Sequence, residues 1–203
     1  MTESNLELRP ILMAGRVRLE PIAPEHRDDL AAAADRAEIW EHMPSNAAGA
    51  GFDTWFDAAL SMAASGREAV WAVRCLSRGT LVGSTRYLAI VPEHRRLEIG
   101  HTWYAPDCWG SRVNPACKFA LLRYAFETLG FNRVELKTDI ANTRSQAAIA
   151  KLGAVREGVF RAHMVRRDGT LRDSVYFAIT RDDWPAVRQR LQARLAPMPM
   201  ATA

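Results

Sequence analysis

The sequence of 203 residues lacks long hydrophobic runs, and its amino-terminal stretch MTESNLELRP has no apolar core. A membrane span needs roughly 18 apolar residues in succession, and a secretory signal needs an apolar segment. Cysteine is scarce as well. Cys75, Cys108 and Cys117 are odd in number and form no CxxC pair, so neither a disulfide framework nor a zinc site is indicated. We therefore expect a cytoplasmic protein with reduced thiols that binds neither a metal nor a membrane.

The glycine-rich signatures of the common nucleotide-binding enzymes are also missing. No GxxxxGK[ST] occurs, and no GxGxxG follows a predicted strand, which argues against a P-loop NTPase or a dinucleotide-binding enzyme. There is no aromatic-rich strand of the kind that reads RNA, so nucleic acid is not the expected partner.

The composition, 48% hydrophobic and 25% charged, is that of a chain able to bury a sizeable core, and its length fits one domain. The formal charge is +4, and the basic residues are nearly all arginine, scattered along the chain. This charge favours anionic partners, among which it does not distinguish a nucleotide-like cofactor from an acidic protein or a nucleic acid. A solvated, arginine-rich surface explains it equally well.

Hydrophobic periodicity predicts an α/β protein with a mixed sheet. A strand, a nearly apolar helix and another strand follow one another between residues 96 and 139, which indicates a parallel βαβ crossover. The core should span about 17–195, with a disordered tail at 196–203. The predicted strands are 17–22, 69–75, 80–91, 96–104, 133–139, 154–165 and 174–180, and the predicted helices are 24–38, 51–66, 115–129, 141–153 and 181–195.

The stretch WGSRVNPACK, residues 109–118, joins a predicted strand to the nearly apolar helix. Asn114 stands where a helix is capped, and Pro115 stands at the first helical position. A helix start leaves backbone N–H groups without partners, and such groups attract anions, phosphates above all. The turn is therefore a candidate site for a phosphorylated cofactor, and its alternative is an ordinary capped helix start.

Four segments together resemble the GNAT superfamily of acyl-CoA-dependent N-acetyltransferases, in particular its RimJ/RimL-like branch. They are LEIGHTWYAPDCWG, RYAFETLGFNRVELKTD, ANTRSQAAIAKLGAVREGVFRAHMV and DGTLRDSVYFAIT, and the resemblance runs from about Val17 to Trp184. It implies a central, mostly antiparallel mixed sheet with the parallel βαβ unit at the cofactor site. It also implies acetyl-CoA as the cofactor and no metal.

In that family a turn written Q/R-x-x-G-x-G/A holds the CoA pyrophosphate on backbone amides. This sequence departs from the pattern at Trp109, Arg112 and Asn114, and Pro115 has no amide to offer. Arg112 could compensate with its charge, or it could crowd the turn. The positions that the resemblance assigns to the cofactor here are Trp109, Gly110, Ser111, Arg112, Val113 and Asn114, with Asn142 and Ser145 from the family's N-x-x-S element.

Transfer of an acetyl group to an amine requires a base for the amine and a proton for the departing thiolate. Glu98 lies on the strand that leads into the cofactor turn, and alternation places it on one face with Gly100 and Thr102. It is the candidate base, acting through water, although an exposed strand residue or an ion-pair partner would look the same. The resemblance makes Ser145 the proton donor. Asn142 could cap a helix, bind the cofactor, or do both.

The acceptor pocket should be built by the early helices and the last hairpin. Its candidate residues are Trp40, Met43, Phe52 and Trp55, although aromatic residues at helical spacing are more often core. Tyr176 and His163 are weaker candidates for a role in the site, because packing or surface positions explain them as well.

The expected function is acetyl-CoA-dependent N-acetylation of a primary amine, an α-amine of a protein, a peptide or a small molecule. The alternatives are a non-catalytic acyl-CoA-binding module and an enzyme that uses another donor such as succinyl-CoA. A basic RNA- or ribosome-binding protein ranks last. The chain could also form a homodimer.

Overall fold

The computed structural model describes residues 7–196, so all but the first residue of the predicted tail at 196–203 lies outside the described residues. Eight strands form one sheet in the order β1-β2-β3-β4-β5-β6-β8-β7. Neighbouring strands pair antiparallel except β5 and β6, which pair parallel, as the βαβ prediction requires. The strands are β1 Leu12–Ala14, β2 Val17–Pro21, β3 Ala69–Cys75, β4 Thr80–Val91, β5 Arg96–Tyr104, β6 Arg133–Asp139, β7 Val155–Val165 and β8 Leu171–Thr180.

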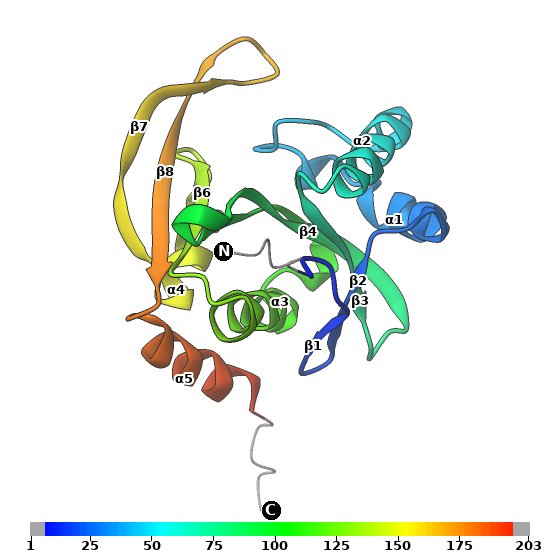
Figure 1. Cartoon of the computed structure of the whole chain (residues 1–203). Helices are drawn as coiled ribbons and strands as arrows, with labels where there is room; N and C mark the ends of the chain where they lie inside the picture. The colour runs from blue at the N-terminus through cyan, green and yellow to red at the C-terminus, as the bar shows by residue number, and fades with distance from the viewer. Residues whose placement is uncertain (1–6, 197–203) are drawn as a thin grey trace, which may run out of the picture.

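Helices cover both faces of this sheet (Figure 1). The helices α3, α4 and α5 pack over the larger core, together with one face of most strands. The helices α1 and α2 pack over a second core on the other face. The bounds are α1 Arg27–Ala34, α2 Phe52–Ala64, α3 Val113–Arg123 followed by a π-helical turn at Tyr124–Thr128, α4 Thr143–Leu152 and α5 Trp184–Leu195.

The predicted order of elements is confirmed, with three differences. The strand Leu12–Ala14 was not predicted, because three residues are too few to show alternation. The first helix is shorter than 24–38, because only 27–34 is α-helical and 3-10 turns flank it. The helix predicted at 115–129 begins at Val113, so Asn114 lies inside its first turn and does not cap it.

The parallel pair at the centre of the sheet is short. β5 and β6 are in register only from Arg96 with Arg133 to Glu98 with Glu135. Beyond these residues β6 continues to pair with β8 as far as Asp139, whereas β5 continues to pair with β4. The sheet therefore opens between β5 and β6, and the start of α3 and the start of α4 lie beside the opening.

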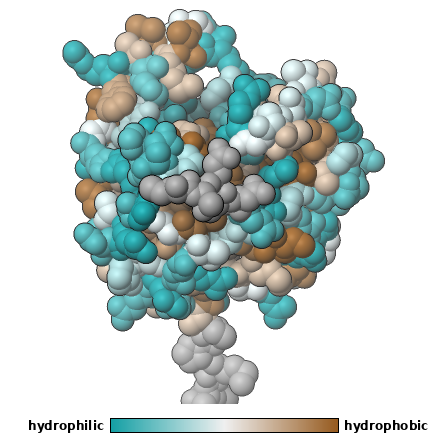
Figure 2. Space-filling model, in the orientation of Figure 1, coloured by the Kyte–Doolittle hydropathy of each residue, from teal (hydrophilic) through white to brown (hydrophobic). Residues whose placement is uncertain are grey.

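Hydrophobic residues reach the surface in scattered groups, among them some at the top of Figure 2, where the β7–β8 hairpin lies. Phe160, Val165 and Leu171 of this hairpin are exposed. Within residues 7–196, no helix is both long enough and apolar enough to cross a membrane.

Candidate active site

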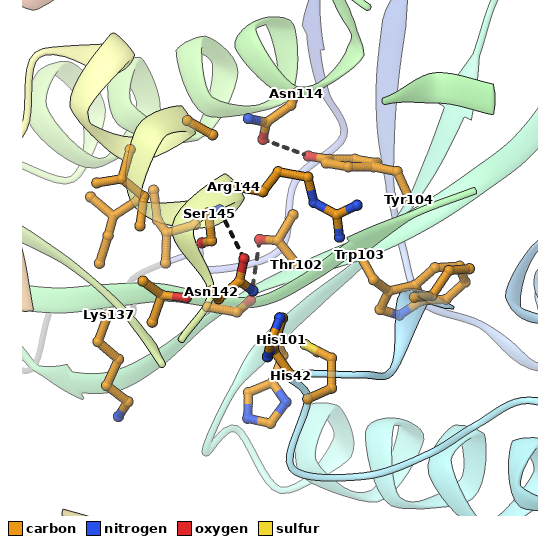
Figure 3. Close-up of a pocket in the computed structure, with 18 of the residues that line it drawn as sticks. His42, His101, Thr102, Trp103, Tyr104, Asn114, Lys137, Asn142, Arg144 and Ser145 are labelled. Carbon is orange, nitrogen blue, oxygen red and sulfur yellow. Dashed lines mark hydrogen bonds between the residues drawn. The ribbon is translucent and has the colours of Figure 1, made fainter. Parts of the chain in front are cut away.

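A cavity of about 300 Å³ occupies the opening between β5 and β6. Its walls come from β5, β6, the two helix starts and the segment 38–44 that precedes α2. Figure 3 shows side chains of α4 and of β5 around this hollow. Of the predicted site residues, those that line it are Met43, Glu98, Trp109, Gly110, Asn114, Asn142 and Ser145.

A β-bulge in β5 shapes the floor of the cavity. Ser84 of β4 pairs with Trp103, but Arg86 pairs with Gly100, so one residue of β4 faces two of β5. His101, at the bulge, has a φ of +47°, in the left-handed region that non-glycine residues rarely adopt. The bulge reverses the alternation of side chains along the rest of the strand.

The face predicted for Thr102 is therefore wrong. Its hydroxyl accepts a hydrogen bond from Lys118 Nζ of α3 at 2.7 Å, on the side of the sheet opposite to α2. Glu98 and Gly100 do share a face: a Cβ on Gly100 would lie 2.8 Å from Glu98 Oε1. The absence of a side chain at residue 100 thus leaves room for the Glu98 carboxylate.

Glu98 is 4% exposed and lines the cavity. Its Oε2 lies 2.9 Å from Lys137 Nζ on β6. Burial raises the pKa of Glu98 above its ordinary value, and the Lys137 ammonium opposes the rise. A carboxylate with a raised pKa is a stronger base than an exposed one, and the Lys137 ammonium beside it favours the ionised form.

His101 is a residue of the cavity that the sequence did not single out. Burial, with the cations Arg86, Lys137 and Arg172 nearby, lowers its pKa to about 4. The imidazole is therefore neutral at pH 7, and it adds no positive charge to the cavity. No local pattern marks this histidine, because its position depends on the bulge.

The turn before α3 offers backbone N–H donors, as predicted, but its side chains make other hydrogen bonds than those expected. Ser111 Oγ accepts from the Val113 amide at 3.2 Å and so acts at the helix start in place of Asn114. Asn114 Oδ1 instead accepts from the Tyr104 hydroxyl at 3.3 Å. Gly110 has a φ of +72°, a conformation that favours glycine. The amides of Gly110, Arg112 and Asn114 make no hydrogen bond within the described part of the chain.

Three of the six predicted turn residues do not line the cavity. Val113 is buried beneath the turn. The exposed side chain of Arg112 is directed away, because its NH1 donates to the Ala196 carbonyl at 3.0 Å. Ser111 is used in the turn itself. Trp109, by contrast, lines the cavity and donates from Nε1 to the Tyr104 carbonyl at 2.9 Å.

The start of α4 forms the facing wall. Asn142 caps the helix, since its Oδ1 accepts from the Ser145 amide at 2.9 Å, and both residues line the cavity. The guanidinium of Arg144 lies over the Trp109 ring, 3.6 Å from its centroid. This cation–π contact connects the two helix starts across the opening, and Arg144 is thus an additional cation that the sequence did not single out.

Lys118 is a third residue of the cavity that the sequence did not single out. It is 5% exposed, and burial lowers its pKa to about 8. Its ammonium donates to the Thr102 hydroxyl, and no carboxylate of residues 7–196 lies within ion-pair distance of it. In the sequence it follows Cys117 in an apolar helix, a position that gives no sign of a cavity.

The predicted acceptor residues divide into two groups. Met43 lines the cavity. Trp40, Phe52 and Trp55 do not: they are buried with one another and with Trp103 in the core beneath α1 and α2, as their helical spacing allows. This wall of the cavity consists instead of the 38–44 segment, with the residues Glu38, Ile39, His42, Met43 and Pro44.

The two weaker candidates lie outside the cavity. His163 and Tyr176 face each other on the β7–β8 hairpin, with Tyr176 Oη 3.3 Å from His163 Nε2, and neither lines the cavity. Among residues 7–196 there is no group of three or more His, Cys, Asp or Glu placed to hold a metal ion.

Comparison with known proteins agrees with this geometry. Residues 16–155 match the family model described as "Acetyltransferase (GNAT) domain". The chain is 30% identical over 106 residues to the Bacillus subtilis (strain 168) protein "Putative ribosomal N-acetyltransferase YdaF". The aligned segment covers 52% of this chain and 57% of that relative, so the chain spans less than two thirds of its length.

Solved structures show the same fold over most of the chain. A GCN5-related N-acetyltransferase from Brucella melitensis is 31% identical to this chain, with a TM-score of 0.85. The alignment covers 95% of this chain and 90% of the Brucella chain. Mycobacterium smegmatis RimJ in complex with CoA-disulfide is 22% identical with a TM-score of 0.75, covering 91% and 93%, a likeness of fold alone. With its open mixed sheet and the family match over 16–155, the chain belongs to the GNAT family of acetyltransferases.

Proposed function

We propose that the protein is an N-acetyltransferase that uses acetyl-CoA and acts on an α-amine of a protein, a peptide or a small molecule. The observation that carries this proposal is the placement of one buried carboxylate, Glu98, in the same cavity as the unpaired amides of a helix start. A base for an amine and donors for a phosphorylated cofactor are the two requirements of such a transfer. The family to which the chain belongs supports the same reaction class.

The residues at the cofactor side fit CoA. The amides of Gly110, Arg112 and Asn114 are donors for a pyrophosphate, and the Gly110 backbone allows a close approach. Arg144 lies exposed at the same opening and adds positive charge. Acetyl-CoA, when bound there, supplies the thioester whose acetyl group is transferred. Mycobacterium smegmatis RimJ, which has this fold, was solved in complex with CoA-disulfide.

Within this proposal, Glu98 accepts the proton of the attacking amine through a water molecule. The Ser145 hydroxyl, at the first turn of α4, is the proton donor to the leaving sulfur. Asn142 holds the turn that presents Ser145 and offers its amide nitrogen to the cavity. The Lys137 ammonium favours the ionised form of Glu98, which is the form that acts as a base.

An α-amine is favoured over a lysine side chain by its acidity. An α-amino group has a pKa of about 7.7 to 8.0, so a useful fraction is neutral near pH 7, whereas lysine has a pKa of about 10.4. Because of this difference in pKa, deprotonation of lysine requires about 3 kcal/mol more free energy than deprotonation of an α-amine. The RimJ/RimL-like resemblance and the name of the Bacillus relative support a protein N-terminus as the acceptor.

A turnover screen tests the proposal. Acetyl-CoA is offered with peptides that carry a free or a blocked N-terminus and one lysine, and with small amines, and free thiol and acetylated product are both measured. We expect product at the α-amine, and Glu98→Gln should lower kcat/KM by about two to four orders of magnitude. Glu157→Gln, a carboxylate at the surface of β7, is the matched control and should act like the parent.

Each alternative function predicts a different result. A non-catalytic acyl-CoA-binding module would be stabilised by acetyl-CoA and release no thiol with any amine. An enzyme for another donor would turn over succinyl-CoA faster than acetyl-CoA with the same amine. Acetate on the lysine, or equal rates with free and blocked N-termini, would contradict the α-amine assignment.

A further inference from the structure

Arg172 of β8 lies where two cavities meet. A second cavity of about 350 Å³ lies between the segment 41–44 and the turn of the β7–β8 hairpin, and Arg172 lines it as well as the active-site cavity. Met43 and Met164 also line both, so the two hollows adjoin. Arg172 therefore stands at the junction of the second cavity with the cavity that contains Glu98.

The guanidinium of Arg172 has no hydrogen-bond partner among residues 7–196. The residue is 8% exposed, and its Nε is buried without a partner. Within this described range, the one carboxylate at ion-pair distance is Asp139, whose Oδ2 is 3.9 Å from Nε, too far for a hydrogen bond. Burial without a hydrogen-bonded partner is costly for a charged group, so this arrangement calls for an explanation.

Asp139 does not supply that explanation, because it is already bound by others. Arg166 donates to both of its oxygens, from Nε to Oδ2 at 2.7 Å and from NH2 to Oδ1 at 2.9 Å. The amide of Ala141 donates to Oδ1 at 2.9 Å. Asp139 is thus the partner of Arg166 and of the chain that follows β6, and Arg172 is left beside a satisfied carboxylate.

Two other cations near the cavity have close carboxylate partners. Lys137 Nζ is 2.9 Å from Glu98, and Arg86 NH1 is 2.7 Å from Glu68. Arg86 Nε is also buried without a partner, but Arg86 lines neither cavity, whereas Arg172 lines both and its guanidinium makes no hydrogen bond within residues 7–196. A guanidinium fork matches a carboxylate with two parallel hydrogen bonds.

We propose that Arg172 binds a carboxylate carried by the acceptor, so that the substrate of this enzyme is an amine with a nearby acidic group. This inference rests on the proposed N-acetyltransferase function. The carboxylate can be the α-carboxylate of an amino acid or an acidic side chain close to a peptide N-terminus, and Arg172 recognises the same chemistry in both. Its binding at the junction of the cavities directs the amine end of the acceptor into the cavity that contains Glu98.

Two matched substrate pairs test the inference. One pair is an amino acid and its carboxamide, and the other is a peptide with Asp at its second position and the same peptide with Asn. Rates are compared per neutral amine over a series of pH values, because the neighbouring carboxylate raises the pKa of the amine above that of the matched amide. We expect the parent to prefer the carboxylate in at least one pair by about ten- to a hundredfold in kcat/KM.

The variant Arg172→Gln should reduce that preference to within about twofold, because it lowers the rate with the carboxylate substrate more than the rate with the amide substrate. Arg172→Lys should retain part of the preference, since it keeps the charge and loses the fork. Arg188→Gln, an exposed arginine of α5, is the control and should keep the full preference. Parent enzyme that treats both pairs alike, or a preference that survives in Arg172→Gln, would overturn the inference.

A binding measurement separates this inference from the proposed function. Titration of the CoA-loaded protein with an N-acetylated Ala-Asp peptide and its Ala-Asn counterpart needs no turnover. Selective binding of the acidic peptide that Arg172→Gln abolishes supports the inference even where no amine is acetylated. Turnover combined with equal binding of both peptides would contradict the inference and leave the N-acetyltransferase assignment intact.

Discussion

Lys137 Nζ lies 2.9 Å from Glu98 Oε2, so the candidate base is paired across the opening of the sheet with a cation of the neighbouring strand. Glu98 belongs to the last parallel pair of β5 and β6, and Lys137 lies two residues beyond that pair, where the strands separate. The two charges of this ion pair therefore lie in the cavity at the point where β5 and β6 begin to separate.

Lys137→Met should shift the pH dependence of activity. Lys137 holds the pKa of Glu98 down against the effect of burial, so its removal raises that pKa further. The reactive form is the carboxylate, and activity falls as the pH decreases through the pKa of Glu98. We expect the acid limb of kcat/KM to move to higher pH in Lys137→Met, whereas Lys151→Met, on α4, should keep the parent profile. An unshifted acid limb would separate Glu98 from the titration.

Gly100→Ala should impair activity more than stability. The new Cβ would meet Glu98 Oε1 and Leu88 Cδ2, each at 2.8 Å, and both atoms end flexible side chains that can move. We expect a loss of about 1 kcal/mol in the free energy of unfolding and a larger proportional loss in kcat, because the carboxylate is displaced. Gly158→Ala, where an added Cβ meets nothing within 4 Å, is the control for a glycine in a strand. Full activity in Gly100→Ala would show that Glu98 can act from another rotamer.

Lys118→Met should stabilise the fold at pH 7. The pKa of Lys118 falls from 10.5 to about 8 on folding, so the folded state binds its proton less tightly than the unfolded state does. Below pH 8 this difference costs about 3 kcal/mol, and the cost disappears as the pH rises to about 10.5. In chemical denaturation the free energy of unfolding of the variant should exceed that of the parent at pH 7 by up to that amount, less the contribution of the lost hydrogen bond to Thr102. Between pH 8 and 10 the difference between the two proteins should shrink. A less stable variant would indicate that the bond outweighs the desolvation.

Arg144 and Arg112 should differ in their effect on CoA. Arg144 lines the cavity above Trp109, whereas Arg112 is directed toward Ala196. We expect Arg144→Ala to weaken CoA binding by about tenfold and to flatten its salt dependence, as the loss of an anion-binding charge would. Arg112→Ala should change the dissociation constant by less than about threefold. The reverse ranking in calorimetric titrations would place the Arg112 side chain on the cofactor.

Local patterns predicted most of the fold and part of the site. Alternation and turn residues are local properties, so the strands 69–75, 80–91, 96–104 and 133–139 were predicted at the bounds that the structure shows. Glu98, found through its place on the strand before the turn, lines the cavity, and so do Asn142 and Ser145, found through the family's N-x-x-S element. Their chemical roles stay predictions.

The remainder depends on contacts between distant segments. The bulge at His101 arises from how β5 pairs with β4, which alternation along one strand does not reveal. Lys118 and Arg172 look like ordinary basic residues in the sequence, and only packing shows that they are buried. The aromatic residues of the second core were interpreted as a pocket because core and pocket share the same composition. The wall is instead a segment with little periodicity.

Because of the bulge, the arrangement of the site also depends on the number of residues in β5. Deletion of residue 101 would restore simple alternation, and Trp103 would then turn from the α2 side to the α3 side while Thr102 turned the opposite way. A tryptophan would enter the core that Tyr104 and Lys118 share, and the aromatic cluster under α2 would lose a member. Relatives can therefore exchange residues along this strand more readily than they can gain or lose one between Gly100 and Trp103, and gaps in an alignment should avoid that interval.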